Sequence, residues 1–157
     1  MLHPEASAIL EKIKEEINQA YGFHDRIPRI NYGPCGVFAK IFLDNWNELF
    51  INKCHICFIL TSARDECDHI TIRLSSGELY DGGIGIHSDN EYSGIFLIEE
   101  MLVYDEKRLE KWSYGLDRTY PRFCPDFNLG FVEGVVHSNL ENLFKLVGPA
   151  VNNTRDC

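Results

Sequence analysis

Three side chains whose types suit nucleophilic catalysis occur along the chain in the order Cys35, His69 and Asp81. A cysteine thiolate is a strong nucleophile, an imidazole can take and return its proton, and a carboxylate can hold the imidazole in one orientation. Cys35 stands between Pro34 and Gly36, where a loop is expected to become an amphipathic helix. The chemistry then requires that the fold bring a base and an orienting carboxylate to this cysteine.

The helix that is expected to carry Cys35 spans residues 34–50. Its apolar residues recur at intervals of three and four and form one wide face: Val37, Phe38, Ile41, Phe42, Trp46, Leu49 and Phe50. Pro34 suits the first helical position, because the N–H group that proline lacks would have no partner within the helix. Cys35 is thereby placed in the first turn, where unpaired backbone N–H groups favour a thiolate and can donate hydrogen bonds to a developing oxyanion.

His69 and Asp81 are expected on the two strands of a β-hairpin. Residues 68–74 alternate between apolar and polar side chains, residues 75–77 read Ser-Ser-Gly as a turn, and residues 78–81 return. The apolar positions of the first strand are Ile70, Ile72 and Leu74. These account for the core face, so the imidazole of His69 should point to the other side of the strand. The two polar residues are nearly symmetrical about the turn, so Asp81 can lie beside His69 and accept its second N–H.

The remaining elements follow from the same periodicities. They are a helix over 5–20 that Gly22 ends, an irregular loop over 23–34, a buried strand over 54–61, a segment over 96–104 that suits strand or helix, a helix over 106–116 and a short helix over 139–147. The aromatic segment 114–131 is expected to be an irregular loop, with the functional alternative that it walls a cleft beside Cys35. This order predicts an α+β fold in a single domain over residues 1–157.

Composition and charge exclude several classes of function. The formal net charge is −9, and Lys and Arg form no run longer than the pair at 107–108, so a nucleic-acid partner is not expected. No apolar run approaches the roughly 20 residues that span a bilayer, and the first twenty residues are too charged for a signal peptide. We therefore predict a cytoplasmic protein without a membrane partner, whose six cysteines are reduced thiols.

Cys54, Cys57, Cys67 and His69 allow a different interpretation, since they are ligand types that would complete a tetrahedral structural zinc site. The first two stand in a predicted strand, where positions three apart face opposite sides, and this argues against a shared metal. Zinc therefore remains an alternative, and the preferred interpretation has no metal and no cofactor.

The segments around the three polar residues resemble the papain-like superfamily in its broad sense. That superfamily includes bacterial NlpC-type cell-wall peptidases, transglutaminase-like proteins and arylamine N-acetyltransferases. The matching segments are GPCGVFAKIF, DHITIRL and ELYDGGIG, in the same order and within residues 31–85. The resemblance implies a nucleophile helix packed on a small antiparallel sheet, with Cys35, His69 and Asp81 as a catalytic triad.

The resemblance also implies a cysteine-dependent acyl-transfer enzyme, with a peptidase or amidase acting on a peptide or amide substrate as the preferred reading. Transglutaminase-like or N-acyltransferase activity and a non-catalytic binding module are the alternatives. Asn31 is the candidate for an oxyanion-hole amide, in place of the Gln of papain-type peptidases. Gly36, at the helix start, and Gly82, which would let a substrate chain approach the backbone, complete the predicted site.

Overall fold

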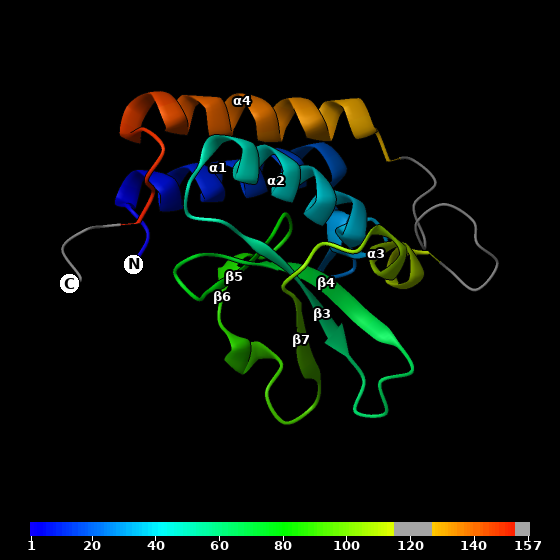
Figure 1. The fold of residues 1–157 in the computed structure, drawn as a ribbon. Coiled ribbons are helices and arrows are strands. Elements are labelled where there is room, and N and C mark those ends of the chain that lie inside the picture. Colours follow the sequence, from blue (N-terminus) through cyan, green and yellow to red (C-terminus); the bar gives the residue numbers. More distant parts are fainter. Residues whose placement is uncertain (115–126, 153–157) are drawn as a thin grey trace.

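The computed structural model describes residues 1–114 and 127–152, and in these ranges it shows an α+β fold with helices layered over one face of an antiparallel sheet (Figure 1). The helices are α1 (Pro4–Tyr21), α2 (Cys35–Leu49), α3 (Glu106–Ser113) and α4 (Leu129–Val147), with short 3-10 turns η1 (Arg29–Asn31) and η2 (Asp89–Glu91). The strands are β1 (Phe23–His24), β2 (Ile27–Pro28), β3 (His55–Leu60), β4 (Cys67–Arg73), β5 (Leu79–Asp81), β6 (Gly85–His87) and β7 (Leu97–Met101). Among the described residues no helix is long and apolar enough to cross a membrane.

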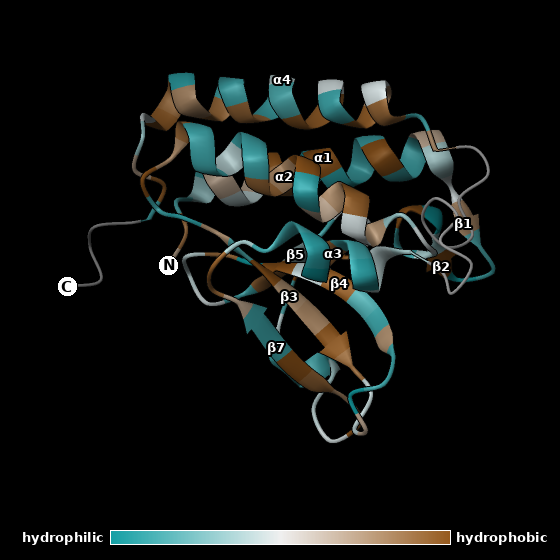
Figure 2. Cartoon of the chain, turned by 45° about the vertical axis from the view of Figure 1, so that its right-hand side comes forward, coloured by the Kyte–Doolittle hydropathy of each residue, from teal (hydrophilic) through white to brown (hydrophobic). Residues whose placement is uncertain are grey.

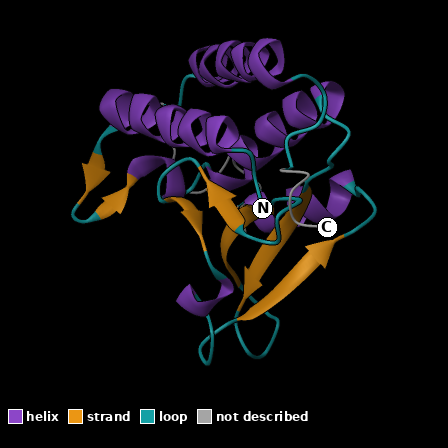
Figure 3. Cartoon of the chain, turned by 90° about the vertical axis from the view of Figure 1, so that its left-hand side faces the viewer, coloured by secondary structure: helices purple, strands orange, loops and turns teal. Residues whose placement is uncertain are grey.

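Five strands form the main sheet in the order β6-β5-β4-β3-β7, and every neighbouring pair is antiparallel. The strands β1 and β2 form a separate pair at the edge of the molecule (Figure 3). The β4–β5 hairpin predicted from the sequence is present, with Ile72 opposite Tyr80 and Arg73 opposite Leu79. Because β5 pairs only with these last two residues of β4, the first half of β4 is left to border a cavity.

The helix that was predicted to carry Cys35 is also present, and it starts one residue later than expected. Pro34 is the N-cap and Cys35 is the first helical residue. The rings of Phe38, Phe42 and Trp46 stack along the buried face of α2, with centroids 6.1 and 5.4 Å apart. Burying a side chain of this size contributes about 2 to 3 kcal/mol. The packing of this face holds the start of α2, and therefore Cys35, against the sheet.

The two faces of β4 are both covered, by different parts of the chain. Ile70 and Ile72 belong to the main core beneath the helices, as the alternation predicted. On the opposite face of the sheet, Cys57 and Ile59 of the neighbouring strand β3 pack with Tyr92 in a second, smaller cluster. The hydropathy view shows β3 as mostly apolar, in contrast to the mixed surfaces of the helices (Figure 2). His69, which pairs with Ile59 across the strands, is consequently buried rather than solvated.

Other parts of the fold differ from the sequence predictions. The C-terminal helix begins at Leu129 and not near residue 139, because Asn128 caps it by accepting a hydrogen bond from the N–H of Phe131. Leu129–Phe131 therefore belong to α4, whereas 115–126, most of the aromatic segment predicted as a loop, lie outside the described residues. The ambiguous segment 96–104 contains the strand β7, and the expected loop 23–34 contains β1, β2 and η1.

Candidate active site

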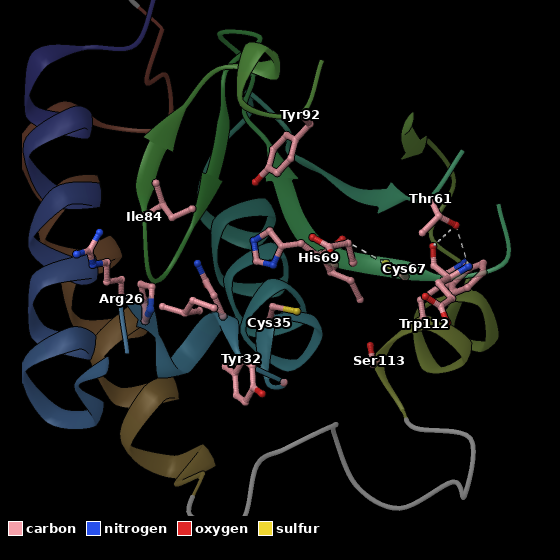
Figure 4. Close-up of a pocket in the computed structure, with 17 residues that line it drawn as sticks. Arg26, Tyr32, Cys35, Thr61, Cys67, His69, Ile84, Tyr92, Trp112 and Ser113 are labelled. Atoms are coloured by element: carbon pink, nitrogen blue, oxygen red, sulfur yellow. Dashed lines mark hydrogen bonds between the residues drawn. The ribbon is translucent and has the colours of Figure 1, made fainter. Parts of the chain in front are cut away.

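A cavity of about 550 Å³ contains Cys35 and His69 among its lining residues (Figure 4). Its walls come from β2 and the segment between β2 and α2, the start of α2, the first half of β4, the loop that joins β3 to β4, the turn after β5, and the end of α3. The Cys35 side chain is half-buried, so the thiol is reachable without opening the core. The cavity is large enough for a small organic group or a short stretch of peptide.

His69 lies between the thiol and a carboxylate. Its Nε2 donates to Asp81 Oδ2 over 2.8 Å, and both residues are buried, at 7% and 1% exposure. Because Nε2 is occupied by Asp81, Nδ1 is the ring nitrogen that is left for Cys35. Burial alone would lower the pKa of His69, but its hydrogen bonds with Asp81 and with Cys35 outweigh burial and raise that pKa to about 10. The site therefore favours a protonated imidazole next to the sulfur atom.

The Asp81 carboxylate is held by four hydrogen bonds. Besides the contact of Oδ2 with His69, Oδ1 accepts from Asn31 Nδ2 at 3.0 Å and from the backbone N–H groups of Gly83 and Ile84 at 2.9 and 2.7 Å. Burial would raise the pKa of Asp81, but the hydrogen bond and charge of His69, together with these donors, lower it to about 2. Asp81 is therefore ionised at neutral pH and fixed in orientation.

The start of α2 supplies backbone donors beside the thiol. Pro34 occupies the N-cap and forms no side-chain cap hydrogen bond, while the N–H of Phe38 bonds to its carbonyl oxygen. The N–H groups of Cys35 and Gly36 precede that first helical hydrogen bond, and they point out of the helix end. Such groups can donate to negative charge that develops on a substrate oxygen close to the sulfur.

The six site residues predicted from the sequence make different kinds of contact in the structure. Cys35, His69 and Asp81 come together as predicted, and Asn31 contacts Asp81. The amide of Asn31 therefore orients the carboxylate, a different contact from the predicted oxyanion donor.

The two predicted glycines serve packing. A Cβ atom on Gly36 would overlap the side chain of Ser113 in α3, and one on Gly82 would come within 2.9 Å of the Phe38 ring. Gly36 thus permits the close approach of α2 and α3, and Gly82 lies against the core outside the cavity.

The sequence reading missed a second buried histidine behind Asp81. His87 is only 9% exposed. Its Nδ1 donates to the carbonyl oxygen of Gly85 at 2.8 Å, so its Nε2 is left to accept from the hydroxyl of Tyr92 at 3.0 Å. His87 Nε2 lies 3.9 Å from Asp81 Oδ2. The sequence also did not lead us to predict that the backbone N–H groups of Gly83 and Ile84 donate to Asp81. An Asp followed by two glycines is, however, typical of a turn in which the Asp side chain accepts hydrogen bonds from the backbone that follows it.

The side chains of the zinc alternative do not meet. Cys54 belongs to the main core, Cys57 to the cluster on the other face of the sheet, and the Cys67 thiol donates to the carbonyl oxygen of His69. Burial raises the pKa of Cys57 to about 12, despite the nearby charge of Arg73. Within the part of the chain that the structure describes, no group of three or more His, Cys, Asp or Glu side chains is placed to hold a metal ion.

Comparisons with protein-family models, with curated proteins and with solved structures found no significant match.

Proposed function

We propose that this protein is a cysteine-dependent acyl-transfer enzyme of papain-like type, which hydrolyses a peptide or amide bond. The observation that carries the proposal is the arrangement of one imidazole between two partners. His69 Nε2 is bonded to the ionised Asp81 at 2.8 Å, and the same ring shares a hydrogen bond with Cys35 at the start of α2. A nucleophile, a base and an orienting carboxylate in contact constitute the machinery of acyl transfer.

The proposed reaction begins with attack of the Cys35 thiolate on the carbonyl carbon of the amide. A sulfur–carbon bond forms, and the carbonyl oxygen becomes an oxyanion that accepts from the backbone N–H at the start of α2. Collapse of this intermediate breaks the carbon–nitrogen bond, and the leaving amine takes a proton from His69. The enzyme is left as a thioester with a neutral imidazole.

Water completes the proposed cycle. His69 accepts a proton from the water molecule as its oxygen attacks the thioester, and the carbon–sulfur bond then breaks. The products are a carboxylic acid and the Cys35 thiolate, with the proton held again on His69. Throughout, Asp81 stabilises the imidazolium and keeps Nε2 protonated, so that Nδ1 faces the thiol.

The rate of iodoacetamide labelling of Cys35 against pH tests this proposal, with mass spectrometry to resolve the site. We expect labelling in the wild type to stay fast at pH 6, well below the roughly 8.5 at which a free cysteine ionises, and to be lost at that pH in His69→Ala. His137→Ala is the control, because this exposed histidine lies on α4 away from the cavity.

Two results separate the possibilities. If Cys35 labels at the same rate with and without His69 across the whole pH range, the proposed base does not act on the thiol and the proposal fails. If Cys35 is activated, a screen of amide substrates with and without added primary amine then distinguishes hydrolysis from the transfer reactions of transglutaminase-like proteins and N-acyltransferases.

A further inference from the structure

The cavity extends to both sides of the proposed nucleophile. Figure 4 shows Arg26, Tyr32 and Ile84 on one side of Cys35, and Thr61 and Trp112 on the other. The thiol is therefore near the middle of the cavity and not at a closed end. A substrate whose chain continues in both directions from the scissile bond fits this shape, whereas a small terminal amide would use only part of it.

One side of the cavity presents large apolar side chains to solvent. Ile27 is 46% exposed, Tyr32 is 37% exposed and Ile84 is 49% exposed, and all three line the cavity. They come from β2, from the loop before α2 and from the turn after β5, three separate segments of the chain. Single exposed apolar residues are common, but three that converge beside a candidate nucleophile form a surface which an apolar group can cover.

This apolar side, defined by Ile27, Tyr32 and Ile84, is held in place by the same contacts that hold the triad. The backbone N–H of Ile84 is one of the donors to Asp81, so the position of this residue is tied to that of the carboxylate. A Cβ atom on Gly83 would lie 2.6 Å from the Cβ atom of Pro28, which shows how closely the turn packs on β2. In addition, Asn18 of α1 donates to the carbonyl oxygen of Gly83 at 2.9 Å. A surface fixed in this way loses little conformational entropy when it binds a ligand.

The opposite side has a different chemistry. Thr61, Glu66, Asp68 and Trp112 line it, and the two carboxylate residues are exposed. An apolar group placed there would desolvate charged groups without pairing them, which is unfavourable. The side of Ile27, Tyr32 and Ile84 has three exposed apolar residues and one charged residue, Arg26, whereas the opposite side has one aromatic residue, Trp112, and two exposed carboxylates. An apolar substituent of the substrate is therefore more favourably placed on the side of Ile27, Tyr32 and Ile84.

We infer that the substrate is a peptide-like chain that carries a bulky aliphatic or aromatic side chain next to the scissile amide, and that this side chain packs on Ile27, Tyr32 and Ile84. The inference rests on the proposed function, because it takes Cys35 as the point of attack. Ile84 is accordingly a specificity-determining residue, and its side chain selects the substrate while its backbone orients Asp81.

Electrophilic probes that label Cys35 can test the preference without knowledge of the natural substrate. In each probe the thiolate forms a sulfur–carbon bond and chloride leaves. A leucine chloromethyl ketone extends toward the acyl side of the scissile bond, and a chloroacetyl-leucine amide extends toward the amine side. The glycine forms of both probes serve as references, and unsubstituted iodoacetamide reports activation of the thiol alone.

We expect the leucine form to react about tenfold faster than the glycine form in one of the two probe families, since a side chain buried in an apolar pocket gives selectivity of this order. The Ile84→Ala variant keeps the N–H that binds Asp81, and we expect it to reduce the leucine-to-glycine ratio by roughly threefold or more. Ile51→Ala is the matched control, because Ile51 is 66% exposed and does not line the cavity. This control should keep the wild-type ratio.

The outcomes distinguish the inference from the function on which it rests. A ratio near one in both families, with iodoacetamide labelling that still depends on His69, overturns the substrate preference and leaves the proposed function intact. A high leucine-to-glycine ratio that Ile84→Ala does not change also overturns the substrate preference and leaves the proposed function intact. Labelling that does not depend on His69 refutes the proposed function, and the inference then falls with it.

Discussion

Replacing Asp81 with asparagine removes one charge from the buried site while nearly preserving its shape. In the wild type Oδ1 accepts three N–H groups and Oδ2 accepts one from His69. The three donors still need an acceptor, so the amide oxygen of the asparagine takes the place of Oδ1. Its NH₂ group must then face His69 Nε2, and two donors cannot bond to each other. The imidazolium loses its partner, and the neutral ring is driven to carry its proton on Nδ1, toward Cys35.

The size of the effect follows from the hydrogen bond that is lost. A hydrogen bond to a charged group contributes about 1.5 to 3 kcal/mol, and about 1.4 kcal/mol corresponds to a tenfold change in an equilibrium constant. We therefore expect Asp81→Asn to lower the rate of Cys35 labelling at pH 6 by about 10- to 100-fold. The difference should shrink above about pH 9, where a free thiol ionises without help from an imidazolium.

The assay is iodoacetamide labelling from pH 5 to pH 10, resolved to Cys35 by mass spectrometry, with thermal unfolding to show that the variant is folded. Asp89→Asn is a matched control, because it removes a hydrogen-bonded carboxylate that pairs with Arg73 and does not line the cavity. We expect this control to keep the wild-type pH profile. A folded Asp81→Asn protein that labels at the wild-type rate at pH 6 would refute the role given to the carboxylate.

The same pair of residues predicts how the stability of the protein depends on pH. The pKa of His69 is raised from 6.5 to about 10, so its contribution to stability is full below pH 6.5 and is lost as the pH rises through about 10. The pKa of Asp81 is lowered from 3.8 to about 2, so its contribution is full above pH 3.8 and is lost as the pH falls through about 2. Urea unfolding should therefore show a loss of stability in the wild type between pH 7 and pH 10 that is smaller in Asp81→Asn.

Two further variants test the surroundings of the site. Asn31→Ala removes one of the donors to Asp81, and we expect Cys35 labelling at pH 6 to fall by roughly fivefold, with the pH profile displaced in the same direction as for Asp81→Asn. A fall at every pH by the same factor would instead indicate a general structural role. Gly36→Ala places a Cβ atom against Ser113 of α3, and we expect it to reduce the free energy of unfolding by about 1 to 3 kcal/mol. Gly134→Ala is the control, because a Cβ atom there has nothing within 4 Å, and it should leave the free energy of unfolding unchanged or raise it by up to about 1 kcal/mol. Urea unfolding that ranks the two variants in the opposite order would contradict the packing argument.

Local patterns in the sequence were sufficient for the elements that carry the three polar residues. The apolar period of α2, the proline at its start, and the alternation and turn of the β4–β5 hairpin each depend on residues that are close together in the chain. The placement of Cys35 in the first turn and of Asp81 near His69 followed from them. The register of the hairpin also follows from its short turn, because the turn leaves few ways to pair the two strands.

The length of α4 depended on tertiary packing. Residues 129–138 include two glycines and three β-branched valines, which have low intrinsic helix propensity, so the sequence predicted a helix only from residue 139. In the structure Val132, Val135 and Val136 are buried where α4 packs on α1 and α2. The apolar area that these side chains bury outweighs their local preference.

The sequence by itself determined which residues are candidates for the proposed chemistry and on which kind of element each one stands. Only the tertiary structure decided that Asn31 orients Asp81, that His87 is buried behind the carboxylate, that Gly82 packs on the core, and that Ile84 lines the cavity. The physical reason is that periodicity reports which face of an element is buried, but not which other segment covers that face. Loops and turns from distant parts of the chain meet at this cavity, and their contacts follow from the packing of α1, α2 and the sheet as a whole.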